Sequence, residues 1–244
     1  GTRTYGTPVV AEGKVLIGTN NGSPRDPRID GDRGVLMCFD EATGRFLWQL
    51  ALPKKSDVVH WDTPLVGITS TPTVEDGRAY VVSNRGEVLC LDLSGMADGN
   101  AGPFRDEGRL MAAKGEPPLD PGPADADILW RYDIPAELGV RQHDSNPSSI
   151  LIQGDFLYVG TANGVDVPHT KVPNPDAPAL IVLDKRSGRL VARDGFGVGP
   201  RILHGQWSSP ALGRAAGGPR VFFGAGNGFV YAAPAWDRAE PDAP

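Results

Sequence analysis

The chain has 244 residues, enough for one large or two small domains, and its 40% hydrophobic and 22% charged residues are typical of a globular protein with a substantial core. Its formal net charge of -6, without a stripe of lysine or arginine, argues against nucleic acid as a partner. No apolar run approaches the roughly 18 residues that a membrane helix needs, so no membrane span is expected in this segment.

The 32 glycines and 23 prolines indicate many turns and therefore many short strands. Four segments repeat one order of signals: a small polar residue before proline, an apolar stretch, a polar turn, a β-branched or aromatic run, and a second turn. The first signal stands at Thr7-Pro8, Thr71-Pro72, Asn146-Pro147 and Ser209-Pro210. We interpret each segment as antiparallel strands joined by hairpins.

The first two segments carry complete units. Residues 6–50 include predicted strands at 15–18, 35–40 and 45–50, and Asn21-Gly22 predicts a tight turn with positive φ. Residues 69–134 include predicted strands at 79–82, 88–92 and 128–132. An insertion at 96–127 separates the last two strands of this second unit, and it is predicted to be an irregular loop or a docking segment.

The third unit, residues 145–194, has predicted strands at 156–160, 180–184 and 189–193, with Asn163-Gly164 as its turn signal and an insertion at 165–178. The fourth, residues 207–233, has predicted strands at 221–224 and 229–232 around Asn227-Gly228 and lacks a fourth strand.

Repeats at this spacing predict an all-β fold, a β-propeller of four-stranded antiparallel blades in which fifteen strands group as 4, 4, 4 and 3. A two-sheet sandwich is the alternative. About 3.75 blades are present, so we expect a fragment of a six- to eight-bladed ring; a four-bladed ring and a ring of two copies are the other possibilities.

A corner between the third and fourth strands recurs in each complete unit. It reads Cys38-Phe39-Asp40-Glu41-Ala42-Thr43-Gly44 followed by Trp48, then Cys90-Leu91-Asp92-Leu93-Ser94-Gly95 followed by Trp130. The third copy has Leu183-Asp184-Lys185-Arg186-Ser187-Gly188, and Ala192 stands where a tryptophan would fall. Asp40, Asp92 and Asp184 are predicted to accept backbone N–H groups of their turns, and Trp48 and Trp130 to pack between blades.

These corners resemble the tryptophan-docking repeat of the quinoprotein family, the pyrroloquinoline-quinone (PQQ) type propellers. The resemblance implies a periplasmic or secreted location. It leaves open whether the protein is an enzyme, because the family contains PQQ-dependent alcohol dehydrogenases and an outer-membrane assembly scaffold lipoprotein. We expect a non-catalytic binding or scaffold domain, with an unknown protein, small molecule or saccharide as partner; the alternative is part of a PQQ-dependent alcohol or sugar dehydrogenase that binds PQQ with calcium.

Connectivity places the links between blades and the loops between second and third strands on one face, called here the linker face. The insertion 96–127 is expected on the opposite face. All four histidines fall on the linker face: His60, His143 and His204 in links, and His169, farther from the axis, in the insertion 165–178.

Trp61, His143, His204 and Trp207 are therefore the candidate cofactor-binding residues, at the mouth of the channel. The alternative is that they only pack between blades. No catalytic residue and no metal ligand is predicted, because the pairs His60–Asp62 and His143–Asp144 have no nucleophile beside them and Asp30-Gly31-Asp32 is too short for a calcium loop. Cys38 and Cys90 are expected to be small buried residues rather than a disulfide.

Overall fold

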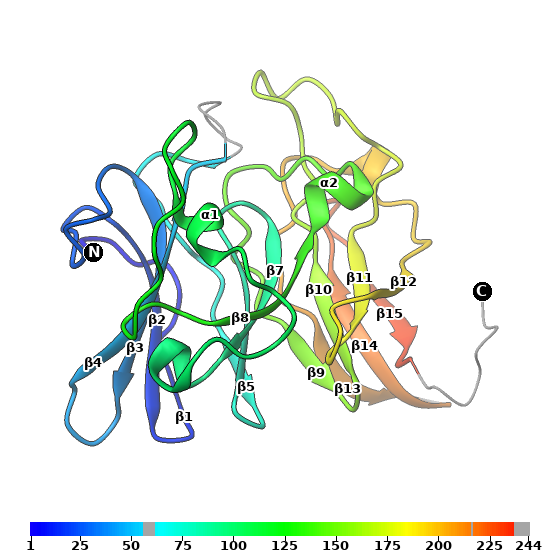
Figure 1. Ribbon diagram of the computed structural model, residues 1–244. Coiled ribbons are helices and arrows are strands. Elements are labelled where there is room, and N and C mark those ends of the chain that lie inside the picture. The colour runs from blue at the N-terminus through cyan, green and yellow to red at the C-terminus, as the bar shows by residue number, and fades with distance from the viewer. Residues whose placement is uncertain (56–61, 216, 237–244) are drawn as a thin grey trace.

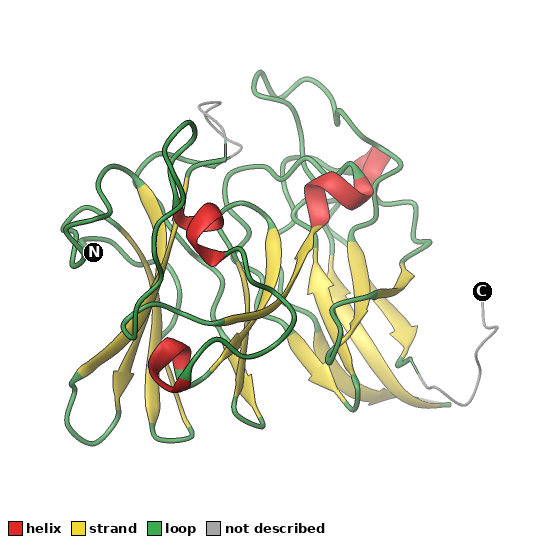
Figure 2. Ribbon diagram, viewed as in Figure 1, coloured by secondary structure: helices red, strands yellow, loops and turns green. Residues whose placement is uncertain are grey.

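The computed structural model describes residues 1–55, 62–215 and 217–236. Within these residues the strands form four separate antiparallel sheets, three of four strands and one of three, and each sheet follows chain order. The sheets lie side by side along the chain, with short helices only in the connections (Figures 1 and 2). This arrangement confirms the predicted grouping of fifteen strands into blades and excludes a two-sheet sandwich.

The first blade comprises β1 (Val9–Ala11), β2 (Lys14–Asn20), β3 (Arg33–Asp40) and β4 (Phe46–Pro53). The second comprises β5 (Thr73–Glu75), β6 (Arg78–Val82), β7 (Glu87–Asp92) and β8 (Ile128–Asp133). The third comprises β9 (Leu151–Gln153), β10 (Phe156–Gly160), β11 (Leu180–Asp184) and β12 (Leu190–Arg193). The fourth comprises β13 (Ala211–Ala215), β14 (Gly218–Gly224) and β15 (Val230–Pro234).

The helices are α1 (Glu107–Met111), α2 (Ile134–Leu138) and the 3₁₀ turns η1 (Gly95–Asp98) and η2 (Gly199–Arg201). Among the residues that the structure describes, none of these helices has the length and apolarity to cross a membrane.

Hydrogen bonds near the first strands join one blade to the next. The Thr7 amide donates to Oγ1 of Thr71 at 3.1 Å, and the Ser149 amide donates to Oγ of Ser209 at 2.9 Å. Thr71 and Ser209 are the small polar residues before proline that mark the start of the second and fourth repeats. The hydroxyl oxygen of each thus accepts an amide hydrogen bond from the preceding blade, at the junction of two blades.

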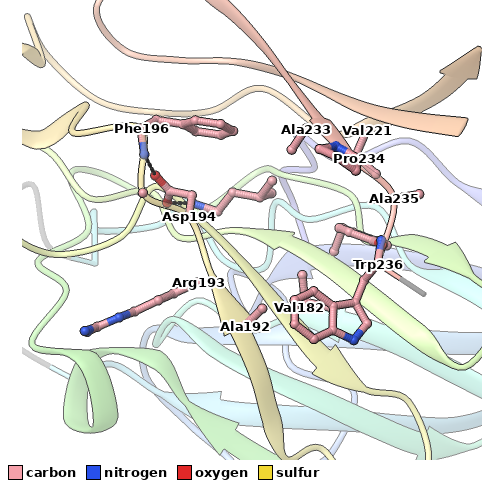
Figure 3. A pocket seen from close by; sticks show the side chains of 13 residues that line it. Val182, Ala192, Arg193, Asp194, Phe196, Val221, Ala233, Pro234, Ala235 and Trp236 are labelled. Carbon is pink, nitrogen blue, oxygen red and sulfur yellow. Dashed lines mark hydrogen bonds between the residues drawn. The ribbon is translucent and has the colours of Figure 1, made fainter. Parts of the chain in front are cut away.

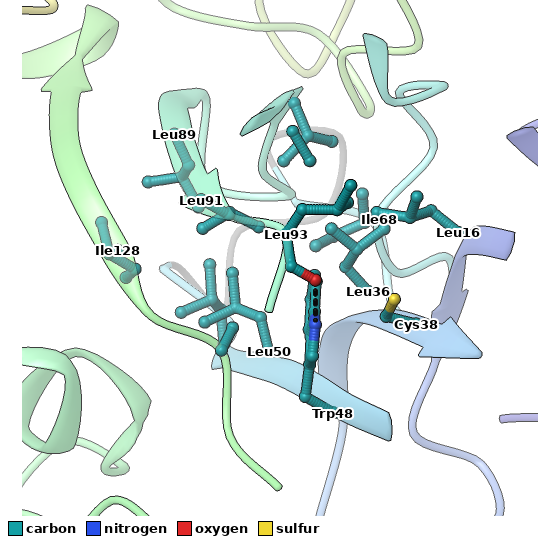
Figure 4. Close-up of a cluster of buried hydrophobic side chains, with 14 of the residues drawn as sticks. Leu16, Leu36, Cys38, Trp48, Leu50, Ile68, Leu89, Leu91, Leu93 and Ile128 are labelled. Atoms are coloured by element: carbon teal, nitrogen blue, oxygen red, sulfur yellow. Dashed lines mark hydrogen bonds between the residues drawn. The ribbon is translucent and has the colours of Figure 1, made fainter. Parts of the chain in front are cut away.

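Both tryptophans are buried between blades, as predicted, and each docks on the corner of the following blade. Figure 4 shows this arrangement for Trp48. Trp48 is 1% exposed and its Nε1 donates to the carbonyl oxygen of Leu93 at 3.0 Å. Trp130 is 5% exposed and its Nε1 donates to the carbonyl oxygen of Lys185 at 3.2 Å. Each indole therefore buries its apolar surface between two sheets while its single donor is satisfied.

The corner aspartates hold the turns on which these rings rest. Asp40 accepts the amide and the hydroxyl of Thr43, at 2.9 and 2.6 Å. These hydrogen bonds from Thr43 lower the pKa of Asp40. Asp184 accepts the same pair of groups from Ser187, and Asp92 accepts the Ser94 amide at 2.7 Å. The predicted role of these carboxylates is confirmed.

The asparagine–glycine signals behave in two ways, which corrects the expectation of a tight turn at each. Gly228 has φ of 82° in a short hairpin, as predicted. Gly22 and Gly164 do not adopt positive φ, because long insertions follow them. There the asparagines act through their side chains instead: Asn21 donates to the carbonyl oxygens of Ile29 and Gly31, while Asn163 donates to that of Asn174.

The insertion 96–127 is not confined to the face opposite the links, which corrects the expectation that it lies on that face. It runs along the outer strand β4 of the first blade, where α1 packs against β4 and Asp125 forms a parallel bridge with Gln49. Arg28 reaches the insertion through its ion pair with Asp125 at 2.8 Å, and Arg33 donates to the carbonyl oxygen of Met111. The segment therefore covers an edge strand that would otherwise present open backbone groups.

Cys38 and Cys90 are buried free thiols in the first and second blades. Burial raises the pKa of each to about 12. Because the thiolate is the reactive form, we expect neither cysteine to react with a thiol reagent at about pH 8 in the native protein, and both to react after denaturation. Reaction of the native protein at the rate of a free cysteine would contradict this placement.

Candidate functional site

Three histidine side chains meet on the linker face. His143 lies between α2 and β9, His169 between β10 and β11, and His204 between η2 and β13. The Nε2 atom of His204 is 2.9 Å from Nε2 of His143 and 3.0 Å from Nε2 of His169. Their ring centroids are 4.5 to 4.7 Å apart. Three segments far apart in the sequence thus place one polar group of each ring at a common point.

Backbone hydrogen bonds fix the segments that carry these rings. The His143 amide donates to the carbonyl oxygen of Ala162 at 3.1 Å, and the Val165 amide donates to that of His204 at 2.8 Å. Gly164 lies between them, and a Cβ atom there would be 2.5 Å from Cβ of His143 and 2.7 Å from the His204 oxygen. The close approach of the three segments therefore requires glycine at this position.

Trp207 forms one wall of the site. Its ring lies edge-on to His204 with centroids 5.1 Å apart, and its Nε1 donates to the carbonyl oxygen of His143 at 3.1 Å. The side chain is 38% exposed. The site therefore has an aromatic plate that is anchored at one edge and open to solvent elsewhere.

The histidines differ in environment. His143 is 1% exposed, and burial lowers its pKa, so that its imidazole is neutral near pH 7. His169 and His204 are exposed. Oδ2 of Asp144 lies 4.0 Å from Nε2 of His143. The arrangement combines a rigid buried ring with two solvent-facing rings.

The structure brings together three of the four residues that the sequence nominated, His143, His204 and Trp207. The fourth, Trp61, lies outside the described residues, as does His60. His169 was expected on this face but not as a site residue, and its approach to the other two rings was missed. A histidine in a proline-rich insertion carries no local signal of its partners, because the path of the loop decides which residues it meets.

The site does not fit the PQQ–calcium pair that the family resemblance raises. Calcium takes about six to eight oxygen ligands, whereas the group of metal-ligating side chains found among the described residues consists of three imidazoles. We therefore derive no catalytic step through the quinone.

A cavity of about 450 Å³ lies between the third and fourth blades (Figure 3). Ala192 pairs with Val182 in the sheet, the position at which Trp48 pairs with Cys38 and Trp130 with Cys90. The missing tryptophan leaves space, and Trp236 enters from another direction with its amide donating to the Tyr158 hydroxyl. The cavity is thus explained by the altered repeat and has mainly apolar walls.

A second hollow, of about 480 Å³, lies beside the insertion 96–127. Its basic side chains are Lys54, Lys55, Arg85, Arg109, Lys114 and Arg131. Acids pair with four of these cations: Lys54 with Asp62 at 2.7 Å, Lys55 with Asp133 at 2.9 Å, and both Arg85 and Arg131 with Glu87, at 3.2 and 3.1 Å. The ion pair of Lys55 with Asp133 joins the link after β4 to the second blade, and those of Glu87 lie within that blade.

Stacked four-stranded blades with tryptophan-docking corners define a propeller of the PQQ-repeat class. A family model described as "Outer membrane protein assembly factor BamB" matches residues 1–240, and the chain belongs to that family. No curated protein sequence matches the chain significantly.

Solved structures with similar folds include BamB from Moraxella catarrhalis, at 11% identity and a TM-score of 0.45, with 94% of this chain and 51% of that one covered. Quinohemoprotein alcohol dehydrogenase ADHIIG from Pseudomonas putida HK5 is similar at 18% identity and a TM-score of 0.48, and the match covers 92% of this chain and 32% of that one. Quinohemoprotein alcohol dehydrogenase from Comamonas testosteroni is 10% identical with a TM-score of 0.40, and the match covers 94% of this chain and 41% of that one. The chain therefore spans about half or less of the length of these structures.

Proposed function

We propose that this chain is a non-catalytic binding domain of the cell envelope, with a protein partner docking on the linker face. The observation that carries the proposal is a set of exposed apolar side chains in the links and loops of that face. Leu65 is 46% exposed, Val167 42%, Leu203 78% and Trp207 38%. Exposed apolar groups gathered on one face are typical of an interaction surface, and a partly exposed tryptophan is the kind of residue that anchors an interface.

The envelope location and the scaffold role follow the description of the family, which names an outer-membrane assembly factor. A protein partner that is itself periplasmic or secreted agrees with the envelope location and with the scaffold role. The alternative, part of a PQQ-dependent oxidoreductase, is less well supported because the described site gathers nitrogen donors rather than the oxygen donors of a calcium site.

Crosslinking tests the proposed surface. A photoreactive amino acid at Leu203 is expected to trap one defined protein partner when the full-length protein is expressed in its own cells. The same group at Arg186, on the corner between β11 and β12 and thus on the other face, should trap none. In the protein that carries the photoreactive group at position 203, Trp207→Ala should reduce the yield of the crosslinked adduct at least about tenfold, because it removes the aromatic anchor.

Equal adducts from both faces would overturn the proposed surface. The catalytic alternative has its own readout: addition of PQQ and Ca²⁺ to the full-length protein, with dye reduction measured in the presence of alcohols or sugars. We expect no quinone-dependent reduction, and a clear rate that requires both PQQ and Ca²⁺ would replace the binding-domain proposal with the oxidoreductase one.

A further inference from the structure

The hydrogen-bond pattern of the three histidines fixes which ring nitrogen carries the proton. Nδ1 of His143 is 3.0 Å from the carbonyl oxygen of Val165, and Nδ1 of His169 is 2.8 Å from that of Val167. A carbonyl oxygen only accepts, so both Nδ1 atoms are protonated. In a neutral imidazole the other nitrogen then holds a lone pair. The Nε2 lone pairs of His143 and His169 are thus both directed at the shared point.

Nε2 of His204 can form a hydrogen bond with only one of its two imidazole neighbours. Its Nε2 atom contacts both neighbouring Nε2 atoms, at 2.9 and 3.0 Å, but an imidazole nitrogen carries at most one hydrogen. At most one of the two contacts is therefore a hydrogen bond, and in the other a lone pair faces a ring nitrogen with no hydrogen between them. A cation at the shared point removes this conflict, because all three Nε2 atoms then donate their lone pairs to it.

We propose that His143, His169 and His204 bind a divalent transition-metal ion of the zinc type through their Nε2 atoms. Imidazole nitrogen suits zinc, copper and nickel, whereas calcium and magnesium prefer oxygen. Zinc–nitrogen bonds of about 2.0–2.1 Å place tetrahedral ligands about 3.3–3.4 Å apart. The two separations at His204 need a few tenths of an ångström of spreading. The three ligand atoms lie within 4.8 Å of one another, so the pair His143–His169 must reach the same spacing. The exposed rings of His169 and His204 can supply these movements.

The surroundings match those of histidine ligands in known metal sites. Such ligands donate their second nitrogen to a carbonyl or carboxylate group, which fixes the ring and the tautomer. His143 and His169 both do so here, through Val165 and Val167. Three protein ligands leave a fourth position open for water or another ligand.

Metal binding would join three parts of the linker face. His143 belongs to the link that enters the third blade, His169 to the long loop of that blade, and His204 to the link that enters the fourth blade. A shared ion would fix the loop 165–178 over the junction and hold Trp207 beside it. This inference goes beyond the proposed partner surface, since it concerns the purified protein alone.

Zinc titration of tag-free, chelator-treated full-length protein tests the proposal. We expect one Zn²⁺ per chain with a Kd of about 1 μM or tighter, and no competition from a large excess of Ca²⁺. Substituting Co²⁺ should give the visible bands of a four-coordinate nitrogen site. His169→Ala should weaken Zn²⁺ binding by at least about 100-fold, because two imidazoles remain, whereas Lys171→Ala on the same loop should leave it unchanged.

The fold of each variant is checked by its circular dichroism and by its melting temperature without metal. His169 is exposed on a loop, so its alanine variant should melt as the metal-free wild type does and lose the rise in melting temperature that Zn²⁺ gives the wild type. Absence of stoichiometric zinc binding, or equal affinity in wild type, His169→Ala and His204→Ala, would overturn the metal site. Either result would leave the crosslinking test at Leu203 unaffected.

Discussion

Replacing Trp48 with alanine is expected to lower the free energy of unfolding by about 3–5 kcal/mol. The ring is 1% exposed and packs in a cluster that includes Leu16 and Leu50 of its own blade and Leu91 of the next (Figure 4). The substitution leaves a cavity at the blade junction and removes the donor that bonds the carbonyl oxygen of Leu93. Urea denaturation followed by circular dichroism measures the change.

Two controls separate the contributions. Trp48→Phe keeps most of the apolar surface but loses the indole N–H, so its cost should be about 1–2 kcal/mol. Phe229→Ala removes a large ring that is 64% exposed, and its effect should stay within about 0.5 kcal/mol. An alanine variant at Trp48 as stable as the wild type would show that the docked ring does not hold the first two blades together.

The blade architecture was predictable because its signals are local and repeated. Most strand pairs are joined by a few residues, and the aspartate, glycine and tryptophan of a corner act within that corner or on the next one. Asp40 bonds Thr43 only three residues away. Repetition of such short-range chemistry along the chain also predicts how the units stack, since one exposed sheet face needs another beside it.

The paths of the long insertions escaped prediction for the opposite reason. Their paths depend on contacts with residues distant in sequence, such as the ion pair between Arg28 and Asp125. No periodic pattern announces such pairs. The turn signal at Asn21-Gly22 failed in the same way, because the side chain of Asn21 serves the following loop rather than a tight hairpin.

The candidate site could be predicted from the sequence only in part. Connectivity correctly gathered His143, His204 and Trp207 on one face, because links between blades share a side. It gave no distances, and it could not show that His169, at φ of 59° in a proline-rich loop, turns back to the other rings. The altered third blade was visible as Ala192 in place of tryptophan, but the entry of Trp236 near that space depends on the course of the chain after β15.

Gly188→Ala is expected to destabilise the protein by about 2–4 kcal/mol, through two additive causes. Gly188 has φ of 70°, a region that strains residues with a side chain. A Cβ atom there would also overlap the six-membered ring of Trp130, which docks on this corner. Displacing the indole would break its bond to the carbonyl oxygen of Lys185.

Gly44 supplies a matched control, because it occupies the same corner position in the first blade with φ of 69° but has no atom within 4 Å of a Cβ. Gly44→Ala should therefore cost only the backbone strain, about 1 kcal/mol. The difference between the two variants measures the contact with the docked ring. In a Trp130→Ala background this excess at Gly188 should vanish, since the overlapping atoms are gone. Equal costs at Gly44 and Gly188 in the wild-type background would show that tryptophan docking does not require glycine at the corner.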